Sequence, residues 1–225
     1  MCQENLCDQR LEETQKNKTS QWNMSDLEDV LNQLKNEKSR DPMGFTNELF
    51  KSNIAGEDVK RAVLKLMNQI KTQLRFPEPL KHCNISSLYK HKGSKHDFNN
   101  YRGIFRVTIL RSILDKLIYN SEYSNIDEHL TDSNVGARRG RNIRDNIFVI
   151  CAVQNEIVKR KLKGIDITIY DAEKCFDKLW EKECLNDLYN NGLKNDILNI
   201  LHLANSNAKV AIQTTNGLTE KVHHK

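Results

Sequence analysis

Asp171 is the residue whose type and position most clearly suggest chemistry. It follows residues 165–170, which alternate isoleucine with polar residues and read as a half-buried strand. The carboxylate would then arrive at the rim of a buried face, where a charge needs a partner. Mg²⁺ is a natural partner, because it prefers one or two carboxylates together with phosphate oxygens. The alternative, which spacing alone favours, is that Asp171 caps a helix beginning near Glu173.

Basic residues concentrate in the middle of the chain. Only Asp97 and Asp115 offset the first group, which comprises Lys81, Lys90, Lys92, Lys95, Arg102, Arg106, Arg111 and Lys116. A second group follows at Arg138, Arg139, Arg141 and Arg144. This distribution favours a phosphate-lined partner, with a merely solvated basic surface as the alternative.

The composition is that of an ordinary globular chain and narrows the function classes. Hydrophobic residues make up 38% and charged residues 29% of the 225 residues, and the net charge is +5. No apolar run reaches membrane-spanning length, and the first residues lack a secretory signal pattern. We therefore expect an intracellular chain, nuclear or cytoplasmic, with reduced cysteines. The absence of C-x-x-C spacing argues against zinc or disulfide frameworks.

The elements that must position these residues follow from periodicity and turn signals. Residues 1–22 are polar and patternless, which indicates a mobile tail. A capping box starting at Ser25 predicts a helix to about Ser39. The apolar pattern predicts further helices at 59–74, 107–118 and 143–157, and two short ones split near Gly192. Strands are expected at 84–90, before a polar hairpin loop at 91–100, and in a closing hairpin at 210–222 with an Asn-Gly turn.

Four sequence blocks, in order, resemble motifs of the reverse transcriptases of non-LTR retrotransposons. Residues 170–177 (YDAEKCFD) resemble the first palm motif. Upstream, residues 38–51 (KSRDPMG with NELFK) resemble the N-terminal fingers motif, and residues 85–116 resemble the lysine-glycine and Tyr-Arg block. Residues 133–141 (SNVGARRGR) resemble the glycine and basic motif that precedes the palm.

The resemblance implies a helix-rich α/β (α+β) fold, with right-hand polymerase fingers and a partial palm carrying a small, incomplete antiparallel sheet. Residues 1–22 would be the tail, 23–160 the fingers-like region and 161–225 the partial palm. The implied activity is RNA-directed DNA synthesis by two-metal nucleotidyl transfer. The implied partners are an RNA template, a DNA primer and deoxynucleoside triphosphates, with no membrane, and the cofactor is a pair of Mg²⁺ or Mn²⁺ ions.

The resemblance also assigns roles to individual residues. Asp171 would bridge the two ions, with the Ala172 carbonyl as a further ligand. Phe176 would lie under the incoming sugar, unless it is an ordinary core aromatic. Lys90 and Arg102 would hold the triphosphate, and Lys92 could replace Lys90. The template backbone would meet the four arginines of the second basic group, Arg138, Arg139, Arg141 and Arg144.

Departures from the family pattern limit the expected activity. Gly103 stands where the family usually has proline, which would loosen the turn that aims Arg102, and Cys175 replaces a usual alanine. No Asp-Asp dipeptide occurs, so we expect this chain alone to be inactive and the natural domain to continue past Lys225. The alternatives are a truncated or decayed copy that binds nucleic acid without catalysis and, on composition alone, a helical interaction protein.

Overall fold

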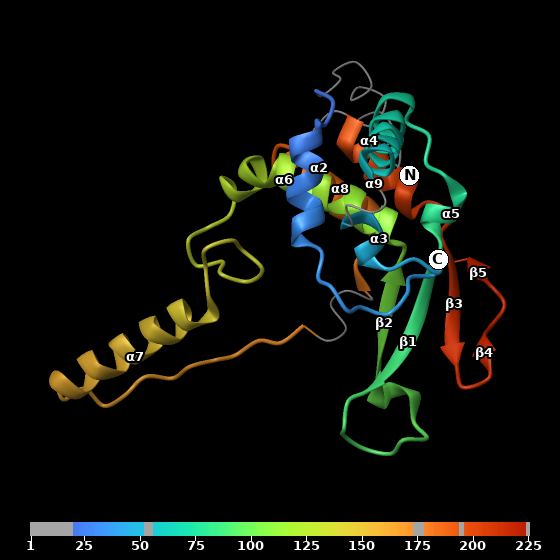
Figure 1. The fold of residues 1–225 in the computed structure, drawn as a ribbon. Helices are drawn as coiled ribbons and strands as arrows, with labels where there is room; N and C mark the ends of the chain where they lie inside the picture. The colour runs from blue at the N-terminus through green and yellow to red at the C-terminus, as the bar shows by residue number, and fades with distance from the viewer. Residues whose placement is uncertain (1–19, 52–55, 173–177, 194–195, 224–225) are drawn as a thin grey trace, which may run out of the picture. The chain divides into compact units, whose positions relative to one another are not determined.

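In a computed structural model of the chain, residues 20–51, 56–172, 178–193 and 196–223 are described, and they form two compact units (Figure 1). Unit 1 combines residues 20–122 with 193–223, and unit 2 comprises residues 123–192. The division therefore falls near 122 and 192, whereas the regions predicted from sequence meet at 22 and 160. Unit 1 is discontinuous in sequence, because both of its segments contribute strands to one sheet.

The fold is α+β and rich in helix. The helices of unit 1 are α2 (Met24–Gln33), α3 (Asn47–Lys51), α4 (Gly56–Gln73), α5 (Glu78–Lys81) and α9 (Asp196–Asn205). Helix α6 (Ile109–Asp127) begins in unit 1, and unit 2 holds α7 (Ile143–Lys159) and α8 (Glu181–Asn190). The strands are β1 (Cys83–Tyr89), β2 (Tyr101–Val107), β3 (Lys209–Thr214), β4 (Gly217–Leu218) and β5 (Val222–His223). No described helix is long and apolar enough to cross a membrane.

The apolar faces of α2, α4, α6 and α9 supply the core of unit 1. Their fully buried side chains include Leu27, Val30, Met67, Ile113, Leu114, Leu117, Ile197, Leu198 and Ile200. Buried positions three or four residues apart, such as Val63, Met67 and Ile70 in α4, mark one buried face of each helix. The helices predicted at 59–74 and 107–118 are thus confirmed as α4 and α6.

Helix α2 begins and ends earlier than predicted. Its capping box is formed by Asn23 and Asp26, each side chain accepting a hydrogen bond from the other's backbone N–H, at 3.1 and 2.8 Å. The predicted cap, Ser25, lies inside the helix. The chain turns extended at Leu34, well before Ser39. The cap was misplaced because asparagine and aspartate form this arrangement as well as serine and glutamate do.

Residues 20–22 are anchored to unit 1, which corrects the expected tail over this short stretch. Trp22 is only 5% exposed. The Asn68 side chain accepts from the Trp22 N–H and donates to the Trp22 carbonyl, both at 2.9 Å. Lys71 donates to the Ser20 carbonyl at 2.7 Å and lies 4.2 Å from the centre of the Trp22 ring. Residues 1–19 lie outside the described part of the chain.

The five-stranded sheet is mixed, whereas the prediction was an antiparallel sheet. Strands β1 and β2 form an antiparallel hairpin, and β3 pairs with β4 and β5 in the same sense. The two hairpins are joined by a parallel pairing of β1 with β3, from Cys83 opposite Val210 to Ser86 opposite Gln213. Parallel neighbours require a crossover connection, which here contains α6, all of unit 2 and α9. The closing hairpin turns through Thr215 and Asn216, and Gly217 pairs with Thr214 at the start of β4, so the turn lies one residue earlier than the predicted Asn-Gly pair.

The Asp41 carboxylate organises the turn that precedes α3. Its Oδ1 accepts hydrogen bonds from the backbone N–H groups of Met43 and Phe45, at 2.9 and 2.8 Å. Its Oδ2 accepts from the N–H of Ile109 at 2.8 Å, at the start of α6. Gly44 adopts a positive φ of 86° in the same turn, which confirms the turn predicted at 41–44. One carboxylate therefore ties this turn to a helix N-terminus, where negative charge is favourable.

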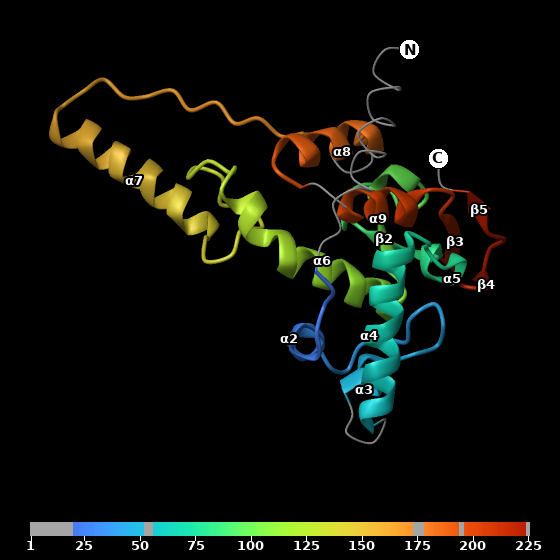
Figure 2. The same ribbon diagram turned by 90° about the horizontal axis from the view of Figure 1, so that it is seen from above.

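Unit 2 exposes the apolar residues that were expected to form a strand. Helix α7 confirms the predicted 143–157 helix, and the chain then turns back along it through residues 160–172 (Figures 1 and 2). Residues 162–172 form no strand, and Ile169 is 87% exposed. The strand predicted at 165–170 is therefore wrong. Alternation shows which residues share a face, whereas a strand also needs a hydrogen-bonding neighbour, and these residues pair with no described strand.

Candidate nucleotide and nucleic-acid site

The β1–β2 hairpin brings Lys90 and Arg102 to neighbouring positions. Arg102 pairs directly with Leu88, and the Lys90 N–H extends the ladder by donating to the Asn100 carbonyl at 2.8 Å. Alternation puts Lys90, two residues after Leu88, on the same face as Arg102. Such diagonal neighbours have Cβ atoms about 7–8 Å apart. Two residues that are twelve apart in sequence thus present adjacent positive charges.

The two side chains differ in how far they are engaged. Both are exposed. The Lys90 ammonium donates one hydrogen bond to the Asn99 carbonyl at 2.8 Å, which leaves two of its three N–H groups available. The Arg102 side chain makes no hydrogen bond or ion pair with another described residue, so its planar fork is open to an incoming anion.

Gly103 lies within strand β2 rather than in a turn. It pairs with Ser87, and a Cβ at this position would meet the Ile85 Cγ2 atom at 3.3 Å. Regular pairing through Gly103 fixes the backbone beside Arg102. The expected loosening is therefore absent, because the direction of Arg102 is set by the strand ladder and not by a turn.

Two tyrosines that sequence reasoning did not single out order the loop of this hairpin, residues 90–100. The Tyr89 hydroxyl donates to the Gly93 carbonyl, and the Tyr101 hydroxyl donates to the Lys95 carbonyl at 2.9 Å. The two rings face each other across the ladder with centroids 5.4 Å apart. The available signal was an aromatic at each end of the polar loop, which is typical of a cross-strand pair.

Asp171 and Ala172 lie at the end of the exposed segment 160–172 of unit 2. The Asp171 carboxylate is therefore solvated and does not reach the rim of a buried face as predicted, since the strand that would have carried it there is not formed. In the described ranges, no three His, Cys, Asp or Glu side chains gather where a metal ion could bind. Asp171 and the Ala172 carbonyl are the ligands that the resemblance assigns to a cation. Phe176 lies outside the described residues.

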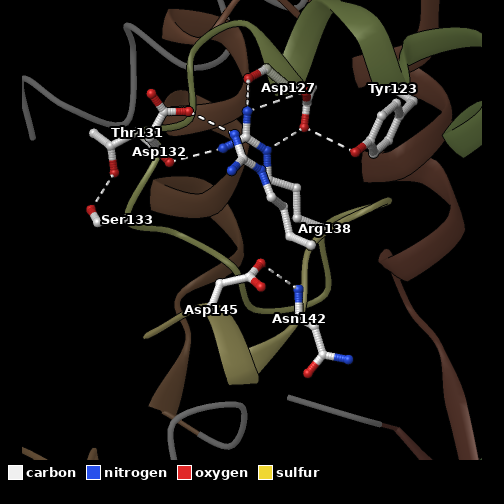
Figure 3. A network of polar contacts seen from close by, with 9 residues as sticks. Tyr123, Asp127, Thr131, Asp132, Ser133, Arg138, Asn142 and Asp145 are labelled. Atoms are coloured by element: carbon white, nitrogen blue, oxygen red, sulfur yellow. Dashed lines mark hydrogen bonds and ion pairs between the residues drawn. The ribbon is translucent and has the colours of Figure 1, made fainter. Parts of the chain in front are cut away.

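The Arg138 side chain, which was predicted to contact a template, instead bonds to the end of α6 and to the loop that follows it (Figure 3). Its Nε donates to the Asp127 Oδ1 at 2.6 Å, and a terminal N–H reaches Oδ2 of the same carboxylate at 3.2 Å. A further bond of 2.9 Å goes to the Thr131 carbonyl. The side chain is 9% exposed, so it is less accessible to a phosphate than the other arginines of this region. The hydrogen bond from Arg138 also holds the pKa of Asp127 below its usual range.

The other three arginines of this region are more exposed than Arg138. The Arg139 guanidinium stacks 4.4 Å from the centre of the Tyr123 ring, and its backbone N–H donates to the Tyr123 hydroxyl at 2.9 Å. Arg141 forms a 2.8 Å ion pair with Asp132 and keeps 40% of its side chain exposed. Arg144 is exposed in the first turn of α7, which begins with a capping box of Asn142 and Asp145.

Each group of predicted binding residues is thus gathered within one unit. Lys90, Lys92 and Arg102 belong to the hairpin of unit 1, whereas Asp171 and the four arginines belong to unit 2. No protein-family model matches this chain.

Proposed function

We propose that this chain is part of an RNA-directed DNA polymerase of the non-LTR retrotransposon type, in which the β1–β2 hairpin holds the incoming triphosphate. The observation that supports it most strongly is the placement of Lys90 and Arg102 on one face of that hairpin. The order of the four sequence blocks supports the same proposal independently.

The charges of the hairpin suit a triphosphate. Arg102 supplies a planar fork that can bond two phosphate oxygens at once, and Lys90 supplies a compact point charge. Their diagonal spacing lets both contact one polyphosphate chain. Lys92, two residues further into the loop, can take the place of Lys90.

Asp171 and the Ala172 carbonyl would hold Mg²⁺ in this proposal, with phosphate oxygens completing the shell. When bound, such ions activate the primer 3′-hydroxyl and neutralise the charge of the leaving pyrophosphate. Phe176 would lie beneath the sugar and exclude a 2′-hydroxyl. Arg139, Arg141 and Arg144 would contact the template backbone, with Arg138 positioning their loop.

The test is binding of a fluorescent deoxynucleoside triphosphate with Mg²⁺ at low salt. Arg102→Gln should weaken binding roughly 10- to 100-fold, because a hydrogen bond to a charged group contributes about 1.5–3 kcal/mol. Arg75→Gln is the matched control, since Arg75 is also exposed and lies in unit 1 away from the hairpin. Equal effects of the two substitutions would remove the support for a triphosphate site, as would equal affinity for the monophosphate.

A second candidate function is nucleic-acid binding without catalysis. The observation that favours it is the exposed, unpaired segment that carries Asp171, far from the buried setting predicted for a catalytic carboxylate. The triphosphate-binding test above separates the two functions, because the second candidate needs no triphosphate site, and primer extension on a primed homopolymer with Mg²⁺ or Mn²⁺ can only reject the second candidate. We expect no incorporation by this chain, because its sequence contains no Asp-Asp dipeptide. Measurable extension would reject the second candidate.

A further inference from the structure

Phe98 is the most exposed large apolar side chain of unit 1. It is 91% exposed and stands in a single 3-10 turn (Phe98–Asn100) within the loop 90–100. The loop extends past the part of the hairpin that β3 covers, since that pairing ends at Ser86 (Figure 1). An aromatic ring left in water forgoes the stabilisation that burial would give. The ring is therefore available to a partner outside the described residues.

The backbone that carries Phe98 is held in place by the loop itself. The Asp97 carboxylate accepts a hydrogen bond from the Asn99 N–H at 2.9 Å, and the Asn100 N–H donates to the Asp97 carbonyl at 3.0 Å. The Asn100 side chain donates to the Ser94 carbonyl at 2.8 Å. The ring thus lies on a turn whose backbone is already ordered, so ligand binding costs little further backbone entropy.

The surroundings of the ring are basic. Lys92 and Lys95 lie in the same loop, and Asp97 is the only acidic residue between positions 90 and 102. The Lys95 ammonium lies 5.8 Å from the centre of the Tyr89 ring, which keeps that charge on the loop. Lys92 is exposed and makes no hydrogen bond or ion pair with any residue in the described ranges. An exposed aromatic beside unpaired positive charge matches a polyanion that also has flat apolar faces.

We infer that this loop is a stacking platform for single-stranded nucleic acid. Phe98 stacks on an unpaired base, and Lys92 and Lys95 hold the phosphates beside it. Stacking requires a base that is free of a duplex, so the platform prefers single strands over duplexes. The inference rests on the nucleic-acid part of the proposed function and needs neither Asp171 nor triphosphate binding.

The test compares a single-stranded RNA with the duplex of the same sequence, measured by fluorescence anisotropy on the full chain. Phe98→Ala should lower affinity for the single strand roughly 5- to 100-fold and leave duplex affinity unchanged. Phe98→Leu, which keeps an apolar side chain without a π-face, should lose most of the same affinity. Phe98→Trp should retain it, and the new indole should be quenched on binding, relative to the wild-type protein with Trp22 and Trp180 as background.

The salt dependence tests the lysines. Lys92→Gln should reduce the slope of log affinity against log salt by about 0.7, as expected when one contact with a single-strand phosphate is lost. Lys65→Gln, an exposed lysine on α4, is the control and should leave the slope unchanged. Equal slopes for both variants would overturn the role of Lys92.

The outcomes also separate this inference from the proposed function. If the wild-type chain binds neither nucleic acid, the platform and the nucleic-acid part of the proposed function fail together. If it binds and Phe98→Ala has no effect, the platform alone fails. If sedimentation shows that the wild-type chain self-associates and Phe98→Ala abolishes this, Phe98 serves a protein contact and the platform is again rejected.

Discussion

Replacing Asp41 by asparagine should destabilise unit 1 by about 1.5–3 kcal/mol, the contribution of one hydrogen bond to a charged group. The carboxylate accepts three backbone N–H groups, two at Oδ1 from Met43 and Phe45 and one at Oδ2 from Ile109. Asparagine retains one acceptor oxygen for the first two. Its amide nitrogen would then face the Ile109 N–H, so two donors would meet at the start of α6.

Asp41→Ala should destabilise unit 1 further, by about 3–5 kcal/mol, because it removes both acceptor oxygens and so all three hydrogen bonds, while water replaces part of these bonds at this half-buried site. The two variants thus form a graded pair. Asp29→Asn is the matched control, since Asp29 is exposed in α2 and its side chain has no hydrogen bond or ion pair with another described residue. We expect its effect to stay within about 0.5 kcal/mol.

The assay is urea unfolding followed by tryptophan fluorescence. Trp22 is buried in unit 1 and should dominate the change, whereas Trp180 of unit 2 is already 76% exposed. A midpoint for Asp41→Asn equal to that of the wild type would refute the reasoning. Equal losses for Asn and Ala would refute the division of the three bonds between the two oxygens.

Two further predictions concern the other anchoring contacts. Asn68→Ala should lower the stability of unit 1 by about 1–3 kcal/mol in the same urea assay, because it leaves the partly buried N–H and carbonyl of Trp22 without their partner; an unchanged midpoint would show that the contact contributes nothing. The hydrogen bond from Arg138 holds the pKa of Asp127 below its usual range. The pair therefore stabilises unit 2 fully above about pH 4, and this stabilisation is lost as the pH falls through the lowered pKa of Asp127. The protection factor of the Arg139 amide, which is the exchange rate corrected for the intrinsic rate at each pH, should therefore fall in acid in the wild type, because this amide donates to the Tyr123 hydroxyl that bonds Asp127. It should show no such acid dependence in Arg138→Gln, with Arg144→Gln as control; the same acid dependence in both variants would contradict this.

Local patterns predicted the elements whose causes are local. The helices α4 and α7 follow from apolar spacing, strand β1 from its composition and flanking loop, and the split between α8 and α9 from Gly192. The closing turn was predicted to within one residue, and Gly217, the residue after it, takes a positive φ of 117°. Each of these features is determined by a window of a few residues.

Features that depend on distant partners were not predictable. Trp22 is anchored by Asn68, which lies 46 residues away, so the polar composition around Trp22 indicated a tail. Residues 165–170 do alternate apolar and polar side chains, but this pattern does not specify a neighbouring strand. The predicted strand was wrong because no described strand pairs with these residues. For the site, the adjacent placement of Lys90 and Arg102 was not predicted, because strand β2 was not predicted and the two residues were paired only by resemblance. The internal bonds of Arg138 depend on how its loop folds back.

The parallel pairing of β1 with β3 also bears on how the protein is made. Strand β1 leaves the ribosome before β3, which follows on the order of 120 residues later. Synthesis proceeds at about 5–20 residues per second, so the edge of β1 that pairs with β3 waits roughly 6–25 seconds for its partner. Unit 2 is synthesised in that interval as an insertion within unit 1. Until β3 emerges, β1 presents unpaired N–H and carbonyl groups to other nascent chains. Slowed translation through residues 123–192 would therefore lengthen the period in which this protein is most exposed to aggregation.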